Sequence, residues 1–326
     1  MKKHKRSTFS GKLGFVLSAA GASVGLGNIW RFPYLAAKYG GGIFLLVYII
    51  LALTFGYTLI MAETSLGRMT RKSPVGAFES FGNSRFISIG GWINAIIPIL
   101  IVPYYSVIGG WVIKYLIEYF AGHSKTLAGD AYFTTFISNG WSTEICFIIF
   151  TLFTLGIIYA GVRNGIERVS KFMMPILIVL SLIIAVYSVT RPGAIEGVKY
   201  FLVPNFDHFS WMTVVSAMGQ MFYSLSIAMG ILITFGSYMK KDTSIEKSTE
   251  NVEIFDTAIA VPNPMFAKTF GIVINIKAGP DFNVSALPPE KAKTAGMIIS
   301  PAMIAIAVSK ISTFSVDFSM EVSFFI

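Results

Sequence analysis

Six long apolar runs constrain the fold of this chain more than any other feature of its sequence. An α-helix needs roughly 20 predominantly apolar residues to cross a bilayer core of about 30 Å. Runs close to or above this length occupy 11–37, 41–67, 87–119, 143–161, 170–190 and 211–239. Because lipid offers no hydrogen-bond partners, each run must satisfy its own backbone groups, and this favours helices. The pattern predicts an all-α, polytopic membrane protein.

The composition excludes several other classes of protein. Hydrophobic residues make up 54% of the 326 residues and charged residues 13%, about half of the 25% typical of soluble domains. The net charge of +9 comes from cations in short connecting segments, without the single basic face that nucleic acid requires. Cys146 is the only cysteine, so neither an intrachain disulfide nor a cysteine zinc cluster is expected. We therefore expect membrane lipid, and no nucleic acid, among the partners.

The positions of the cations predict how the chain is oriented. The tail, residues 1–10, is basic, and further cations follow the second, fourth and sixth runs at Arg68, Arg71, Lys72, Arg85, Arg163, Arg168, Lys171, Lys240 and Lys241. The remaining connections carry fewer cations, chiefly Lys38, Lys125, Arg191 and Lys199. Cytoplasmic loops carry an excess of Lys and Arg. We expect six crossings of the plasma (cell inner) membrane, with a cytoplasmic N-terminus.

Two of the apolar runs are interrupted by glycines and polar residues. The first run contains Gly-Ala-Ser-Val-Gly-Leu-Gly-Asn at 21–28, and the sixth contains Gly-Gln-Met-Phe-Tyr-Ser-Leu-Ser-Ile-Ala-Met-Gly at 219–230. Interrupted membrane helices in corresponding positions of two halves point to a binding site near the bilayer midplane. A close-packing face of small residues is an alternative for the sixth run alone.

Several motifs together resemble one transporter family. The segment 25–34 (Gly-Leu-Gly-Asn-Ile-Trp-Arg-Phe-Pro-Tyr), the glycines 40–42 and the segment 63–68 (Glu-Thr-Ser-Leu-Gly-Arg) are similar to the first two helices of the neurotransmitter:sodium symporters, of the bacterial amino-acid-transporting type. The likeness continues through 103–105, 219–230 and 254–258. It implies an inverted-repeat symporter fold with broken helices 1 and 6, whose half-helix ends bind anionic substrate groups and cations.

The resemblance also implies a domain layout. We expect a cytoplasmic tail at 1–10, a first five-helix repeat at 11–190, an extracellular loop at 191–210, helix 6 with the start of helix 7 at 211–260, and a divergent tail at 261–326 with one possible membrane segment at 294–309. The second repeat is then incomplete, as in a relative truncated after the start of helix 7. Either a rearranged reading frame or a genuine short protein with a cytoplasmic insertion accounts for such a tail.

The resemblance assigns the substrate site. Backbone amides around Leu26 and Gly27, together with the Tyr105 hydroxyl, are expected to hold an amino acid carboxylate, and carbonyls of the broken helices its ammonium. The full set of expected substrate residues is Ser23, Gly25, Leu26, Gly27, Ile101, Tyr105, Tyr223, Ser224, Ser226 and Met229. Its apolar and aromatic members favour a hydrophobic or aromatic amino acid as substrate.

The resemblance also assigns co-transported sodium, and it requires no organic cofactor. A first sodium is expected at Ser23, Asn28, Ser224 and Asp256, since oxygen ligands suit a hard cation. A second is expected at the carbonyls of Gly21 and Val24, together with an eighth helix that is not recognisable in this chain. Residues similar to the family's gates are Arg6, Arg31, Gln220 and Tyr238. Asp256 as a solvated acid near a helix start and Arg31 as an interfacial cation are the alternatives.

The predicted function is therefore sodium-coupled symport of an amino acid. The three histidines, His4, His123 and His208, fall in tails or loops, and no nucleophile motif or metal-ligand spacing is present, so we expect no enzyme. The alternative is a non-transporting, truncated homologue that binds a full-length transporter as an assembly or regulatory partner. Homo- or hetero-oligomers are compatible with either function.

Overall fold

The chain is helical throughout the part that the structure describes. The computed structural model describes residues 8–25, 27–82, 84–127, 131–190 and 194–260, in which no strand forms. The α-helices are α1 (Lys12–Ser23), α2 (Phe32–Lys38), α3 (Gly42–Leu51), α4 (Tyr57–Thr70), α5 (Pro74–Glu79), α6 (Arg85–Phe120), α7 (Ser124–Leu127), α8 (Tyr132–Ser138), α9 (Gly140–Tyr159), α10 (Glu167–Val189), α11 (Ala194–Leu202), α12 (Trp211–Ser224), α13 (Ile231–Tyr238) and α14 (Ile245–Ala260). Short π-helical turns are η1 (Gly27–Arg31), η2 (Ala52–Gly56) and η3 (Val162–Ile166), and η4 (Phe206–His208) is a 3-10 turn. The all-α prediction is confirmed.

Among the described residues, four continuous helices have the length and composition to cross a membrane. They are Gly42–Thr70, Arg85–Phe120, Gly140–Tyr159 and Val162–Tyr187, the first and last of which include the turns η2 and η3. The first predicted run is a bent pair, Lys12–Ser23 and Gly27–Lys38, with an angle of 57° at the break. These helices match five of the six predicted apolar runs.

The connection between the fourth and fifth runs is shorter than we expected. α9 ends at Tyr159 and η3 begins at Val162, so Ala160 and Gly161 alone form the turn. Gly161 makes this tight turn at φ +80°, a conformation that costs glycine little. Arg163 therefore lies in η3 and Arg168 in α10, and neither lies in a connecting loop.

The sixth run forms two short helices, α12 and α13, with residues 225–230 between them. Three residues of this linker, Ser226, Ala228 and Gly230, have positive φ values of 55°, 61° and 71°. Backbone in this conformation cannot continue a right-handed helix. The predicted breaks in helices 1 and 6 are both present.

The segment 191–210, expected as a loop, contains helix α11 and the turn η4. Ala194, Gly197 and Phe201 form the buried face of α11. The Tyr200 hydroxyl donates to the Ala37 carbonyl at 3.0 Å, and Gly41 forms an isolated bridge with Pro204. A Cβ at Gly42 would collide with the Val203 and Pro204 backbone. The glycines 40–42 therefore allow this segment to lie directly on the start of α3.

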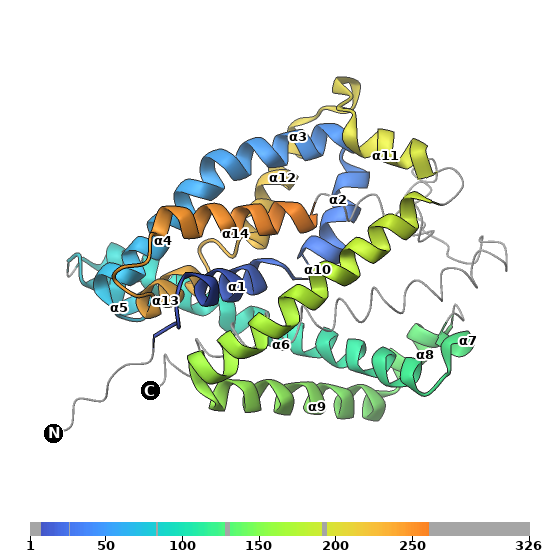
Figure 1. Cartoon of the computed structure of the whole chain (residues 1–326), viewed down its shortest axis with the longest axis horizontal. Helices are drawn as coiled ribbons and strands as arrows, with labels where there is room; N and C mark the ends of the chain where they lie inside the picture. The colour runs from blue at the N-terminus through green and yellow to red at the C-terminus, as the bar shows by residue number, and fades with distance from the viewer. Residues whose placement is uncertain (1–7, 26, 83, 128–130, 191–193, 261–326) are drawn as a thin grey trace.

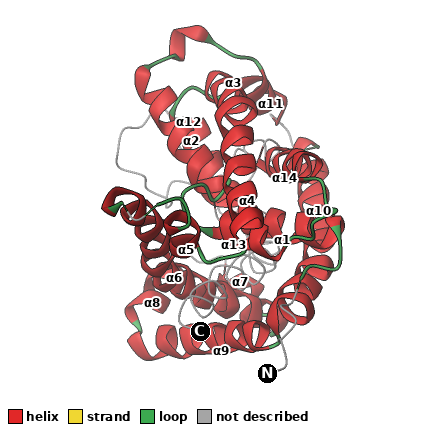
Figure 2. Ribbon diagram, turned by 90° about the vertical axis from the view of Figure 1, so that its left-hand side faces the viewer, coloured by secondary structure: helices red, strands yellow, loops and turns green. Residues whose placement is uncertain are grey.

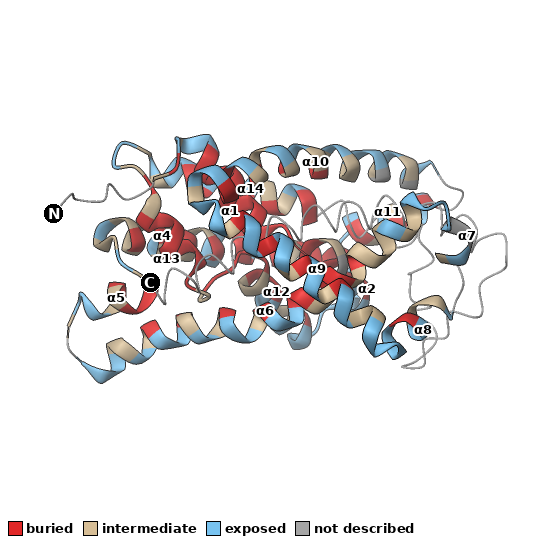
Figure 3. Cartoon of the chain, turned by 90° about the horizontal axis from the view of Figure 1, so that it is seen from below, coloured by how far each residue is buried: buried red, intermediate tan, exposed pale blue. Residues whose placement is uncertain are grey.

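The two broken helices lie inside the bundle. In Figure 1, α3 and α4 run along the upper edge of the molecule and α9 along the lower edge, while α10 crosses between them. In Figure 2, α1 and α13 lie near the centre of the molecule; α13 packs on α4, and α1 packs on α10, α13 and α14. Buried residues concentrate in this interior, whereas α9 and α10 carry mainly exposed and half-buried residues (Figure 3). Their exposed side chains include Leu152 and Leu182, as expected of helices that face lipid.

Candidate functional site

The breaks in the first and sixth runs face each other. α1 ends at Ser23, and Val24 leaves the helix in an extended conformation. The Gln220 Nε2 atom of α12 donates to the Gly27 carbonyl at 3.0 Å, and the Ser226 hydroxyl donates to the Ala22 carbonyl at 3.4 Å. Both bonds join a side chain of the sixth run to a backbone carbonyl of the first run.

A buried cluster of oxygen atoms lies beside the first break. The Ser224 hydroxyl is 2.6 Å from Asn28 Oδ1 and 2.7 Å from Asp256 Oδ1. Asn28 Nδ2 donates to the same Asp256 oxygen at 2.7 Å. The three residues come from η1, α12 and α14, and none is more than 1% exposed. The structure thus brings together three of the residues expected at the first sodium.

The carboxylate of Asp256 has only neutral donors around it. Its second oxygen accepts a hydrogen bond of 2.7 Å from the hydroxyl of Tyr48, a fully buried residue of α3. Within the described residues, no cationic side chain lies within ion-pair distance of Asp256. A buried charge is costly unless it is paired. The site therefore combines oxygen ligands with an uncompensated negative charge, and both features suit a monovalent cation.

A small enclosed cavity adjoins the break in α1. Its walls come from both broken runs and from α6, and the lining residues are Ala22, Ser23, Gly25, Gly27, Ile101, Tyr105, Tyr223, Ser226, Met229 and Ile231. Its volume of about 10 Å³ is close to the minimum for a single water molecule. Eight of the residues expected to bind substrate lie on these walls, and Ser224 lies beside them in the oxygen cluster. An amino acid requires the walls to move apart.

Tyr223 is a wall of this cavity and packs against the opened backbone of the first run. Its hydroxyl is hydrogen-bonded to the hydroxyl of Tyr105. A Cβ on Gly27 would lie 3.0 Å from the Tyr223 ring, so the glycine lets the ring approach the opened backbone. The Arg31 guanidinium lies 5.0 Å from the centre of the same ring, which is within cation–π distance. Tyr223 thus closes the cavity, and Arg31 covers Tyr223.

Two polar side chains hold the break in the sixth run. Glu63 Oε1 of α4 accepts a hydrogen bond of 2.7 Å from the Ala228 amide, and Asn94 Oδ1 of α6 accepts one of 3.0 Å from the Gly230 amide. An unpaired buried amide would cost roughly 1–3 kcal/mol. These two acceptors therefore stabilise the non-helical linker.

The remaining residues expected at the site lie outside both the oxygen cluster and the lining of the cavity, or outside the described residues. Gly21 and Val24 lie at the end of α1, and the described chain ends in α14 without an eighth helix to face them. Tyr238 packs against a cluster that contains Phe9 and Phe15, and its carbonyl accepts a bond of 3.2 Å from the Phe9 amide. Leu26 and Arg6 lie outside the described residues.

Our reading of the sequence missed Tyr48 and Asn94. Both are polar side chains inside apolar runs, and this was their only signal. Their partners are 208 and 136 residues away along the chain, respectively. Only the packed fold shows which buried group each one meets.

Comparisons with known proteins agree with this geometry. The model of the sodium:neurotransmitter symporter family matches residues 6–147 and 133–274. An uncharacterized sodium-dependent transporter of Bacillus subtilis, YhdH, is 32% identical over 88% of this chain and 65% of its own length. The sodium- and chloride-dependent taurine transporter of Rattus norvegicus is 31% identical over 73% of this chain and 45% of its own length.

A solved structure shares the fold. The crystal structure of MhsT in complex with L-phenylalanine matches with a TM-score of 0.85 and 32% identity, covering 98% of this chain and 74% of that one. The chain spans less than two thirds of the curated relatives named above. These relatives are transporters and not enzymes. The chain belongs to the sodium:neurotransmitter symporter family.

Proposed function

We propose that this chain binds sodium together with a hydrophobic or aromatic amino acid and carries both across the plasma membrane. The observation that supports this most is that the proposed sodium site and the proposed substrate cavity are adjacent. The oxygen cluster of Asn28, Ser224 and Asp256 lies directly beside a cavity lined by Gly27 and Tyr223. A cation bound in the cluster would lie close to a carboxylate bound at the opened backbone of the first run.

The substrate site uses opened backbone more than charged side chains. Freed amides near Gly27, at the start of a helical segment, suit a carboxylate, while the carbonyls of Ser23, Tyr223, Ser224 and Ser226 suit an ammonium group. The described walls of the cavity carry no charged side chain. A zwitterion would therefore have both of its charges satisfied by backbone dipoles and by the bound cation. Ile101, Met229 and the tyrosines would contact an apolar or aromatic side chain.

Sodium acts in this proposal as a co-transported substrate. It would take its ligands from the Ser23 carbonyl, Asn28, Ser224 and Asp256, and would neutralise the Asp256 carboxylate. A second sodium at Gly21 and Val24 requires ligands from outside the described residues. Gln220, Arg31 and Tyr223 would close the substrate side, while Tyr238 and Arg6 would belong to the opposite gate.

Radioligand binding to the purified chain tests this function. Phenylalanine, the ligand in the MhsT structure, is the probe, measured in sodium and in potassium at equal ionic strength. We expect saturable binding in sodium and a loss of at least tenfold in affinity in potassium. Ser224→Ala should weaken the sodium dependence, whereas Ser142→Ala, at a half-buried position near the start of α9, should not. Equal binding in both salts would contradict the proposal.

Uptake into vesicles that contain only this chain then separates binding from transport. Accumulation of labelled phenylalanine driven by a sodium gradient is the expected result. Binding without uptake would contradict transport by this chain and favour the alternative of an assembly or regulatory partner. Co-purification with a full-length homologue would then support that alternative.

A further inference from the structure

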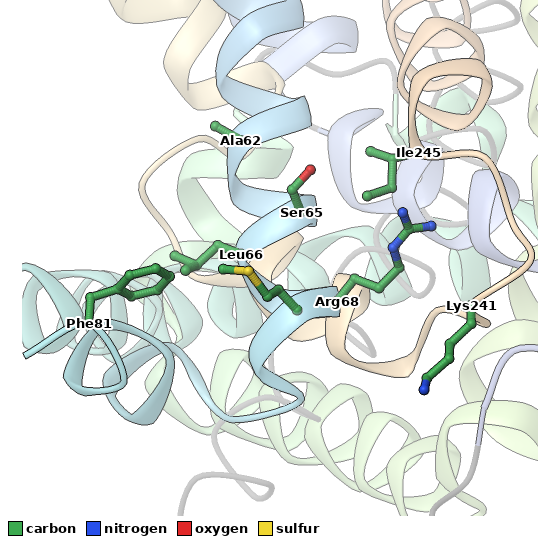
Figure 4. A pocket seen from close by; sticks show the side chains of 8 residues that line it. Ala62, Ser65, Leu66, Arg68, Phe81, Lys241 and Ile245 are labelled. Atoms are coloured by element: carbon green, nitrogen blue, oxygen red, sulfur yellow. The ribbon is translucent and has the colours of Figure 1, made fainter.

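A groove at one end of the bundle combines cations with exposed apolar side chains. It has a volume of about 610 Å³ and is lined by Ala62, Ser65, Leu66, Arg68, Met69, Phe81, Lys241 and Ile245. Its residues come from the last turns of α4, the segment after α5, the connection from α13 to α14, and the first residue of α14. Figure 4 shows Arg68 and Lys241 on one side of this part of α4, with Phe81 and Leu66 on the other.

The two cations of the groove, Arg68 and Lys241, have N–H donors with which to bind an anionic ligand. Arg68 Nη1 donates to the Thr243 carbonyl at 2.5 Å, which fixes the guanidinium and leaves most of its five donors available. Within the described residues, neither Arg68 nor Lys241 is in an ion pair. A guanidinium held in this way is suited to phosphate, because its parallel N–H groups match two phosphate oxygens.

The apolar side of the groove includes strongly exposed side chains. Met69 is 67% exposed and Phe81 56% exposed, and both are close to the end of a helix long enough to cross a membrane. Exposed apolar groups beside basic groups are typical of membrane interfaces, where anionic headgroups meet Lys and Arg and acyl chains cover apolar surface.

We propose that this groove binds the headgroup of an anionic phospholipid, with its phosphate at Arg68 and Lys241 and its acyl chains over Met69, Leu66 and Phe81. The occupant is a membrane lipid and not a soluble phosphate, because five of the eight lining residues are apolar and the groove opens at the end of a membrane span. This site is separate from the oxygen cluster and the cavity, so it does not depend on the proposed transport function.

Native mass spectrometry of the detergent-purified chain tests the site by lipid titration. Dioleoylphosphatidylglycerol and dioleoylphosphatidylcholine have the same acyl chains, so the difference between them isolates the headgroup charge. We expect phosphatidylglycerol to bind more tightly. Near a membrane surface each cation contributes about 1 kcal/mol, so Lys241→Gln should weaken phosphatidylglycerol about fivefold and leave phosphatidylcholine unchanged. Arg68→Gln should weaken it at least as much.

Two controls keep the result specific. Lys199→Gln removes the same charge from an exposed position on α11 and should not change the preference. Within the part of the chain that the structure describes, the Lys241 side chain makes no hydrogen bond, so Lys241→Gln keeps the test valid even where Arg68→Gln disturbs the connection to Thr243. Glycerol phosphate without acyl chains should not compete at the same concentrations. Any one of three results would overturn the proposal. These are equal weakening of phosphatidylglycerol binding by Lys199→Gln, equal binding of the two lipids, and full competition by glycerol phosphate.

Discussion

At the residue scale, Asp256 is the side chain whose surroundings say most about function. It is fully buried and receives hydrogen bonds from Asn28, Ser224 and Tyr48, all of them neutral. Three such bonds orient the carboxylate but leave its charge in place. The position therefore suits a carboxylate whose charge a bound cation would balance, as proposed above. An ordinary solvated acid near a helix start, the alternative that the sequence left open, does not match this burial.

Replacing Asp256 by Asn tests this charge. The amide has nearly the same size, but it removes the attraction for a cation, which at 4 Å and an effective dielectric constant of 20 amounts to about 4 kcal/mol. Because much of that attraction offsets desolvation, we expect sodium to bind at least tenfold more weakly. The measurement is the sodium concentration that gives half-maximal phenylalanine binding. Asp207→Asn, in the exposed turn η4, is the matched control. An unchanged sodium requirement in Asp256→Asn would contradict the assignment.

At the scale of elements, the break between α12 and α13 is held open by specific contacts. Its backbone amides bond to Glu63 of α4 and Asn94 of α6, so two neighbouring helices fix the shape of the linker. Ala228 has φ +61°, which is unfavourable for a residue with a Cβ by about 1–2 kcal/mol. The strain is maintained by the packing around the linker.

Because of this strain, we expect the substitution Ala→Gly to affect stability differently at Ala228 and at Ala62. Ala62 lies exposed inside α4, where Ala→Gly should destabilise the protein by roughly 1 kcal/mol. Ala228→Gly relieves the unfavourable φ, which offsets the entropy that glycine adds to the unfolded chain. We expect Ala228→Gly to leave the thermal midpoint unchanged or raised, and Ala62→Gly to lower it. Intrinsic tryptophan fluorescence during heating measures both. A larger loss in Ala228→Gly than in Ala62→Gly would refute the account.

The two breaks also show what the sequence can predict. Glycines and polar residues inside apolar runs mark positions where a membrane helix opens, and both breaks were predicted from them. The length of the turn at Gly161 and the presence of helix α11 were not, because short elements depend on packing. The partners Tyr48 with Asp256 and Asn94 with Gly230 come from elements far apart in the sequence. Such pairs follow from the three-dimensional fold and not from any local pattern.

At the scale of the whole molecule, cations from distant parts of the sequence gather at one end. The ends of α4 and α13 and helix α5 lie together on the left of Figure 1, whereas α11 lies toward the opposite end. α4 packs against both α13 and α5. Arg68, Lys72, Lys240 and Lys241 therefore share one face of the bundle, and Lys199 lies on another. By the positive-inside rule, we expect the first of these faces to be cytoplasmic.

Cysteine accessibility tests this orientation, since Cys146 is the only native cysteine and is buried in α9. In a Cys146→Ser background, Lys72→Cys reports on the cation-rich face and Lys199→Cys on α11; both positions are exposed. With a membrane-impermeant maleimide on intact cells, we expect Lys199→Cys to be labelled at once and Lys72→Cys only after the membrane is permeabilised. Because both thiols are exposed, denatured protein should label equally in the two variants. The reverse pattern would place the N-terminus outside, and early labelling of both would contradict a membrane between the two faces.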